Sequence, residues 1–239
     1  MRPAAVYPAE KSSLGFQSWL RDVATIATAR SPALALKGLP RGDGSTVLLL
    51  PGFFSGDWTM ADLGRFLRAL DYRVETAGIW FNPGPQRSIL ARLESALLRL
   101  TDDGVPIHLL GQSLGGVFAR DLACRHPGRI KSVITLCTPI RFPVTTPLAP
   151  LAAALAPVHD PEWISRANDI ASPLSVPVTA IYSCDDGIVD WRECLQAESA
   201  TSRNVRVSGA HSTIASSPEA RIAIAEALAG LRESNSAVV

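Results

Sequence analysis

The segment IHLLGQSLGGVFARDLACR, residues 107–125, is the part of the sequence from which we predict the fold. It opens on an apolar run at 107–110, typical of a buried strand, and glycines then predict a tight turn into a helix. Ser113 stands in this turn, with Gly111 and Gly115 two residues away on either side. Because glycine has no side chain to collide in a strained turn, the pattern is typical of a serine nucleophile exposed at the top of a sheet.

Other glycine-rich turns are alternatives for the segment 111–116. An ordinary β-α turn without a catalytic role fits the motif alone equally well. A Walker phosphate loop is excluded because no Gly-Lys-Ser/Thr follows, and a dinucleotide site is disfavoured because Gly-x-Gly-x-x-Gly is absent and the turn lies mid-chain. If Ser113 is a nucleophile, we expect the helix to start at Ser113, with its positive end facing an oxyanion that forms beside the hydroxyl.

Short β-rich runs alternate with segments of helical period along the chain, which predicts a parallel sheet wrapped by helices. The expected strands are 46–50, 72–79, 107–110, 130–136, 178–183 and 204–207, and the expected helices lie around 16–28, 60–70, 89–100, 113–125 and 218–231. The proline-rich segment 141–176 interrupts this rhythm and is expected to be a small lid-like insertion. The predicted fold class is α/β, a single domain over 1–239 with a mostly parallel sheet of about six or more strands flanked by helices.

Composition narrows the classes of partner and location. The chain has 23 basic and 22 acidic residues, spread without a basic run, which disfavours nucleic acid. Prolines and charges interrupt the first twenty residues, where a signal peptide needs an unbroken apolar core. No run reaches the roughly 18 apolar residues of a membrane helix. We therefore expect a cytoplasmic protein without stable membrane insertion; its oligomeric state is left open.

Cysteines give no sign of a metal or redox site. Cys124, Cys137, Cys184 and Cys194 form no Cys-x-x-Cys pair and have no nearby histidine at ligand spacing. Free thiols are expected, and a Cys184–Cys194 bridge remains open because sequence does not give its geometry. No metal and no cofactor are expected.

A serine nucleophile needs a base, and four histidines are available. His108 lies inside an expected strand, His126 precedes a proline at a helix end, and His159 lies in the insertion. His211 follows the last expected strand in a loop just before the final helix. Since such a loop can deliver a side chain to the carboxyl edge of the sheet, His211 is the expected base.

The orienting acid is sought after the strand 178–183, where Asp185, Asp186 and Asp190 compete. Asp186 is favoured because the Asp-Gly step gives a turn that can aim one carboxylate toward the sheet edge. Asp185 is the second choice, and Asp190 is expected to cap the helix that begins at Trp191. A polar turn with solvated acids is the alternative for all three.

The oxyanion hole should consist of two backbone amides. Leu114, the residue after the nucleophile, supplies one, and Phe53 in the loop after the first strand is the candidate for the other. An ordinary turn at Pro51-Gly52 is the alternative. Side chains expected to line a substrate pocket, with ordinary packing as the alternative, are Phe54, Trp80, Phe81, Leu148 and Leu151.

These motifs together make the chain similar to bacterial esterases and lipases of the α/β-hydrolase superfamily over residues 47–231. The matching pieces are LLPGF at 49–53, GQSLGG at 111–116, YSCDDGIV at 182–189 and GAHS at 209–212. The resemblance implies triad roles for Ser113, Asp186 and His211. Two departures are Pro51-Gly52 in place of a common His-Gly, and the absence of two strands that often precede the first.

The expected function is hydrolysis of a small-molecule or lipid carboxylic ester through an acyl-enzyme on Ser113. Thioesterase, lactonase or amidase activity would use the same triad, and a non-catalytic binding protein could share the fold.

Overall fold

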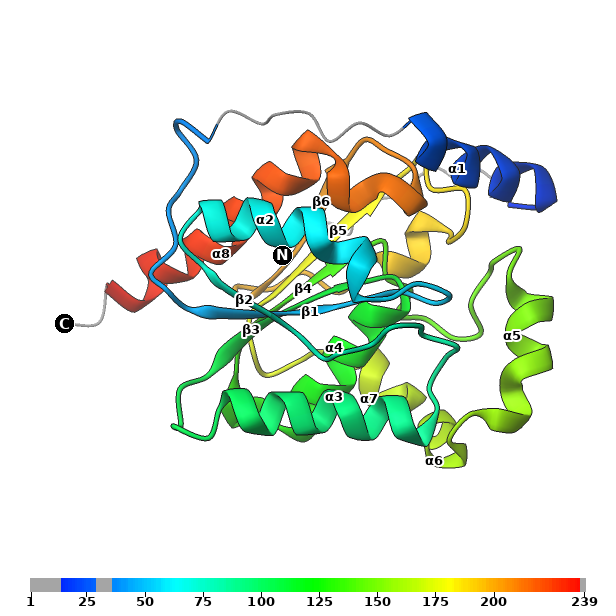
Figure 1. Ribbon diagram of the computed structural model, residues 1–239, viewed down its shortest axis with the longest axis horizontal. Helices are drawn as coiled ribbons and strands as arrows, with labels where there is room; N and C mark the ends of the chain where they lie inside the picture. The colour runs from blue at the N-terminus through cyan, green and yellow to red at the C-terminus, as the bar shows by residue number, and fades with distance from the viewer. Residues whose placement is uncertain (1–13, 29–35, 237–239) are drawn as a thin grey trace.

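The computed structural model describes residues 14–28 and 36–236, and its centre is a parallel sheet (Figure 1). The six strands have the order β2-β1-β3-β4-β5-β6, and every neighbouring pair is parallel. Their bounds are β1 Thr46–Leu50, β2 Arg73–Thr76, β3 Ile107–Gln112, β4 Ile130–Leu136, β5 Val178–Ser183 and β6 Ser202–Val207. The predicted α/β class with a parallel sheet is confirmed.

The strand order brings several loops, which follow different strands, to one edge of the sheet. The chain runs outward from β1 to β2, returns across β1 to β3, and then continues in order to β6. Because all strands are parallel, the loops that follow β1, β3, β5 and β6 all leave from the same carboxyl edge. In open α/β sheets ligands bind at this edge, where the strand order reverses.

Helices cover both faces of the sheet (Figure 1). α2 and α8 lie on one face, and α3 and α4 lie on the other. The helix bounds are α1 Phe16–Thr28, α2 Ala61–Ala69, α3 Arg87–Leu100, α4 Leu114–Arg125, α5 Ala149–Leu155, α6 Pro161–Ser165, α7 Ala167–Ala171 and α8 Pro218–Ser236, and the short 3-10 helices are η1 Asp57–Met60, η2 Pro127–Arg129, η3 Ala156–Val158, η4 Trp191–Cys194 and η5 His211–Ser216.

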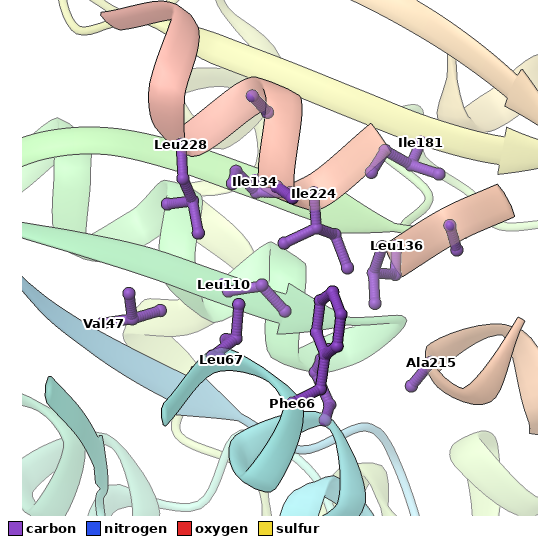
Figure 2. Close-up of a cluster of buried hydrophobic side chains, with 14 of the residues drawn as sticks. Val47, Phe66, Leu67, Leu110, Ile134, Leu136, Ile181, Ala215, Ile224 and Leu228 are labelled. Atoms are coloured by element: carbon purple, nitrogen blue, oxygen red, sulfur yellow. The ribbon is translucent and has the colours of Figure 1, made fainter. Parts of the chain in front are cut away.

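The sheet separates two large apolar clusters, and a third, smaller cluster includes Tyr182 and Ile188. Alternate residues of β1 serve the two faces: Val47 and Leu49 pack in the cluster under α2 and α8, whereas Leu48 and Leu50 pack in the cluster over α3 and α4. Figure 2 shows the first cluster, where side chains of α2 and α8 meet those of the strands. Burial on both faces explains why the inner strands, such as β1, read as largely apolar runs, whereas the edge strands β2 and β6 are partly exposed and more polar.

Some predicted boundaries differ from the structure. The second strand ends at Thr76 rather than at Ile79, because the backbone beyond it bonds to η1: the Asp57 amide donates to the Ile79 carbonyl at 2.8 Å, and the Ile79 amide donates to Asp57 Oδ2 at 2.9 Å. Helix α4 begins at Leu114, with Ser113 as its N-cap. The two bonds between Asp57 and Ile79 join residues far apart in the sequence, so the local sequence pattern did not predict where the second strand ends.

The segment 141–176 contains α5, η3, α6 and α7. Its return to the sheet is held by Arg120 of α4, a buried side chain. Arg120 donates from Nε to the Ile170 carbonyl at 2.7 Å and from Nη2 to the Ser172 carbonyl at 2.6 Å. These bonds tie the end of the segment to the helix that follows Ser113. In the described parts of the chain, no helix combines the length and hydropathy required to cross a membrane.

Candidate active site

Ser113 lies in a strained turn between β3 and α4. Its φ of 52° and ψ of −125° fall outside the regions that residues with a Cβ ordinarily occupy. Its amide donates to the Leu136 carbonyl at 2.8 Å, which anchors the turn to β4. A Cβ on Gly111 would lie 2.3 Å from the Gly115 backbone, and one on Gly115 would lie 2.0 Å from the Leu50 carbonyl. Only glycine fits at either position, which explains the spacing seen in the sequence.

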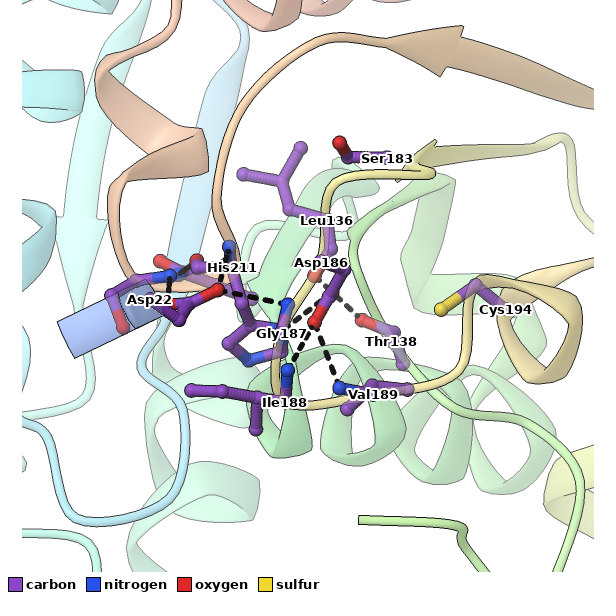
Figure 3. Close-up of polar contacts among 12 residues, drawn as sticks. Asp22, Leu136, Thr138, Ser183, Asp186, Gly187, Ile188, Val189, Cys194 and His211 are labelled. Atoms are coloured by element: carbon purple, nitrogen blue, oxygen red, sulfur yellow. Dashed lines mark hydrogen bonds and ion pairs between the residues drawn. The ribbon is translucent and has the colours of Figure 1, made fainter. Parts of the chain in front are cut away.

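His211 and Asp186 form a buried pair at the carboxyl edge (Figure 3). His211 Nδ1 lies 2.7 Å from Asp186 Oδ2, and Asp186 Oδ1 accepts the Ile188 and Val189 amides at 2.8 and 2.7 Å. The carboxylate is therefore held by its own loop and directed at the imidazole. Asp185 instead accepts a long 3.4 Å bond from the Gly209 amide. The structure brings His211 to Asp186 and not to Asp185.

The surroundings of His211 favour its protonated form. Burial lowers the pKa of the imidazole, but the carboxylate of Asp186, which is both close and hydrogen-bonded, and the charge of Asp22 raise it by more. The net pKa lies above the ordinary value. With Nδ1 engaged by Asp186, the neutral ring carries its lone pair on Nε2, the atom that a general base uses.

The loop of His211 is linked to the turn of Ser113 through the neighbouring residue. Gln112 Nε2 donates to the His211 carbonyl at 2.8 Å. This bond joins the last residue of β3 to the first residue of η5, although the two are far apart in sequence. The motif GQSLGG by itself does not reveal this role of Gln112.

The loop after β1 approaches the same turn. A Cβ on Gly52 would lie 3.2 Å from Ser113 Cβ, so the backbone here passes close to the serine. Among the described residues, neither the Phe53 amide nor the Leu114 amide donates a backbone hydrogen bond. Two unengaged N–H groups beside a serine are the arrangement that an oxyanion hole requires.

Asn82, which is fully buried, fastens this loop from the side of β2. Its Nδ2 donates to the Pro51 carbonyl at 3.0 Å, and its Oδ1 accepts the Gly84 amide at 3.1 Å. Its carbonyl also accepts the Phe54 amide at 2.8 Å. Asn82 therefore sets the position of the residue next to Phe53, a role that its local sequence did not reveal.

An apolar cavity of about 220 Å³ opens beside Ser113. It is bounded by the loop after β1, by the loop that contains Asn82, by the start of α4 and by the segment 141–176. Its lining includes Phe53, Leu114, Val117, Phe142, Leu148 and Trp163. A serine at the wall of a cavity with so few polar neighbours is suited to an apolar substrate group.

Comparisons with known proteins agree with this architecture. Residues 82–173 match the family model described as alpha/beta hydrolase fold. The chain has the α/β-hydrolase fold. A comparison with curated proteins gives no match.

Solved structures with this fold are similar at low sequence identity. A structure from work on LipS and LipT, two metagenome-derived lipolytic enzymes, is 18% identical with a TM-score of 0.63, and the match covers 82% of this chain and 96% of that one. The monoacylglycerol lipase of Paleococcus ferrophilus is 16% identical with a TM-score of 0.57, covering 81% and 97%. The thioesterase domain from the curacin biosynthetic pathway is 15% identical with a TM-score of 0.52, covering 80% and 92%. At these identities the likeness concerns the fold.

Five side chains of this α/β-hydrolase fold were expected to line a substrate pocket: Phe54, Trp80, Phe81, Leu148 and Leu151. Leu148 lines the cavity beside Ser113, whereas the other four are not among its lining residues. Trp80 is 82% exposed. Phe54 has a left-handed φ of 57° and packs edge-on against Phe53 and Phe81, with ring centroids 4.5 and 5.1 Å apart, so it is not directed to the cavity. Leu151 is on the exposed side of α5.

The remaining histidines have other partners. His108 is buried with Nδ1 2.7 Å from Ser132 Oγ, and His126 Nε2 lies 2.7 Å from Glu94 Oε1. His159 lines the cavity, with Nε2 3.4 Å from the Pro83 carbonyl. Asp190 caps η4, as expected, by accepting the Arg192 amide at 3.0 Å.

The four cysteines are free thiols, including Cys184 and Cys194. Ligand-type atoms of Cys137, Asp186 and His211 lie within 4.8 Å of one another. Burial, followed by the charge of Asp186, holds the pKa of the Cys137 thiol well above its ordinary value, so the thiol stays protonated. Two ligands of a tetrahedral ion stand more than about 3 Å apart, whereas His211 Nδ1 and Asp186 Oδ2 are 2.7 Å apart. The group does not fit a metal ion.

Proposed function

We propose that the protein is a carboxylic-ester hydrolase with Ser113 as nucleophile, His211 as base and Asp186 as orienting acid. The observation that carries this proposal is the 2.7 Å contact between His211 Nδ1 and Asp186 Oδ2 at the sheet edge where Ser113 occupies its strained turn. The fold supports hydrolysis in general, and the solved neighbours include lipolytic enzymes. The roles of the individual residues are our inference from the geometry.

The chemistry follows from these positions. Ser113 Oγ attacks the ester carbonyl carbon while its proton passes to His211 Nε2, and the carbonyl oxygen becomes negative beside the Phe53 and Leu114 amides. The tetrahedral intermediate collapses, and His211 returns the proton to the departing alcohol. Water then attacks the acyl-enzyme with His211 again as base, which releases the carboxylic acid and restores Ser113.

The cavity beside Ser113 is proposed to hold the acyl chain, and the segment 141–176 is proposed to cover it. Its volume of about 220 Å³ and its apolar lining favour a short or medium chain over a charged or strongly polar acid. Among the residues that the structure describes, no contact near Ser113 distinguishes an alcohol from a thiol leaving group. Esters are the first choice, and thioesters are the alternative that the same machinery serves.

A covalent probe tests the nucleophile. A fluorophosphonate should label the protein once, with the adduct on Ser113 by peptide mass spectrometry, and S113A should lose both labelling and turnover while keeping its circular dichroism spectrum. The matched control is S165A, because Ser165 is exposed on α6. Ester turnover that persists in S113A would refute the proposal.

A substrate series tests the cavity. We expect p-nitrophenyl esters to be cleaved with a preference for short or medium acyl chains, and L148W to shift that preference toward shorter chains. The control L151W introduces the same side chain on the same segment, but at an exposed residue outside the cavity lining. Acyl thioesters of matched length, measured in parallel, distinguish the two substrate classes.

A further inference from the structure

Asp22 of helix α1 is a buried carboxylate that joins the two loops of the proposed catalytic pair, and it is 3% exposed. Asp22 Oδ2 accepts the His211 amide at 2.7 Å and the Gly187 amide at 3.0 Å, and Oδ1 accepts the Ser212 amide at 2.8 Å. Gly187 follows the acid, whereas His211 is the base. One side chain therefore bonds to both loops at once (Figure 3).

The helix that carries Asp22 is closely fitted to these loops. Ser18 Oγ donates to the Gly187 carbonyl at 2.9 Å, and a Cβ on Gly187 would lie 2.5 Å from the Ser18 carbonyl. About one turn beyond Asp22 on α1, the hydroxyl oxygens of Thr25 and Thr213 are 3.4 Å apart. Gly187, which follows the proposed acid, therefore has a second role besides forming the turn: it lets α1 approach this loop closely.

Asp22 has no cationic partner among the described residues. Its charge is met by backbone N–H groups, and these charge-assisted bonds offset the cost of burying the carboxylate. Its removal would leave three amides without their acceptor, two of them in the loop of His211. The three bonds constrain where His211 stands relative to Asp186.

We propose that Asp22 is a positioning residue for the triad. Helix α1 would then support the active site through this side chain. The inference rests on the proposed function of Ser113, His211 and Asp186. Asp22 contacts no reacting atom. It acts by setting the separation of the acid and base loops and by adding a second negative charge near the imidazole.

The charge effect gives a readout that a structural role alone would not produce. The groups that face His211 are Asp186 from the acid loop, Asp22 from α1 and the Cys137 thiol at the end of β4, and Asp185 bonds to Gly209 nearby. Asp22 raises the pKa of His211. Neutralising it should therefore lower this pKa, and the ascending limb of kcat/KM against pH, which follows loss of the His211 proton, should move toward acid.

The experiment compares D22N with S18A, which removes another bond between α1 and the same loop but leaves the charge in place. We expect D22N to lose about 10- to 100-fold in kcat with little change in KM, on the scale of a small misplacement of reacting groups. Its His211 pKa, titrated by NMR of the imidazole, should fall. S18A should stay within about 3-fold of the wild type and keep the His211 pKa.

Unchanged kcat and unchanged His211 pKa in D22N, with only a lower melting temperature, would overturn the proposal. If D22N does not fold, D22E takes its place: the charge remains, so the pKa should stay raised while kcat falls, and wild-type kcat in D22E would equally overturn it. Failure of the proposed function is a separate result, because it would appear as turnover in S113A, whereas the NMR titration reports on Asp22 without any turnover.

Discussion

The substitution D186N separates the two candidate acids and tests the proposed role of the carboxylate. In the structure Asp186 Oδ1 accepts two amides, from Ile188 and Val189, and Oδ2 faces His211 Nδ1 at 2.7 Å. An asparagine of the same shape can keep its carbonyl oxygen on the two amides. Its amide nitrogen must then face the imidazole as a donor.

A donor at this position selects the wrong tautomer of His211. Nδ1 becomes the acceptor, Nε2 carries the proton, and the ring cannot take the proton of Ser113. Loss of kcat for such a change in a Ser-His-Asp triad is about 10⁴-fold, or about 5 kcal/mol of transition-state stabilisation. Folding should be affected much less, because the amide contacts of Oδ1 are retained.

The assay is steady-state hydrolysis of a p-nitrophenyl ester, with D185N as the matched control. Among the described residues, the only bond of the Asp185 side chain is the 3.4 Å contact with the Gly209 amide, so D185N should stay within a few-fold of the wild type. A loss in D185N that exceeds the loss in D186N, at similar melting temperatures, would refute the assignment of the acid.

Three further outcomes follow from the site. N82A should lower kcat by up to about 10²-fold, the scale of one impaired oxyanion donor, because it removes the side chain that bonds to the Pro51 carbonyl; steady-state kinetics with unchanged kcat would contradict this. G115A should destabilise the fold by several kcal/mol in chemical denaturation, because its Cβ would stand 2.0 Å from the Leu50 carbonyl; wild-type stability would show that the turn relaxes freely. The ascending limb of kcat/KM for the wild type should lie above the ordinary histidine pKa of 6.5, since the net effect of burial and the two carboxylates raises the pKa of His211; a limb below that value would contradict the electrostatic account.

Much of the fold was predictable because its signals are local. Strands buried on both faces read as short apolar runs, so the bounds 46–50, 130–136 and 178–183 agree with the structure. The strand-to-helix turn at Ser113 was readable because steric crowding admits only glycine on either side of it. The cap formed by Asp190 was predicted for the same reason, since it bonds two residues along the chain.

The candidate site was only partly predictable. The pattern around the acid placed Asp185 and Asp186 side by side, and the Asp-Gly turn favoured Asp186 without fixing which carboxylate meets His211. That choice depends on the backbone of the acid loop, where the Ile188 and Val189 amides hold Asp186. The residues that line the pocket were harder to predict, because apolar side chains in loops look alike in sequence. Phe53 lines the cavity, whereas the neighbouring Phe54 is exposed and packs against Phe53 and Phe81.

The parallel α/β architecture and the positions of Ser113 and His211 on strand-end loops can be inferred from the amino-acid sequence, because periodicity and glycine spacing act over a few residues. The groups that support these two residues become visible only in the folded chain. Asp22 lies 165 and 189 residues from the Gly187 and His211 amides that it binds, so nothing in its own helix marks it. A hydrogen bond between distant segments leaves no periodic trace in sequence, since it exists only once the chain has brought its donor and acceptor together.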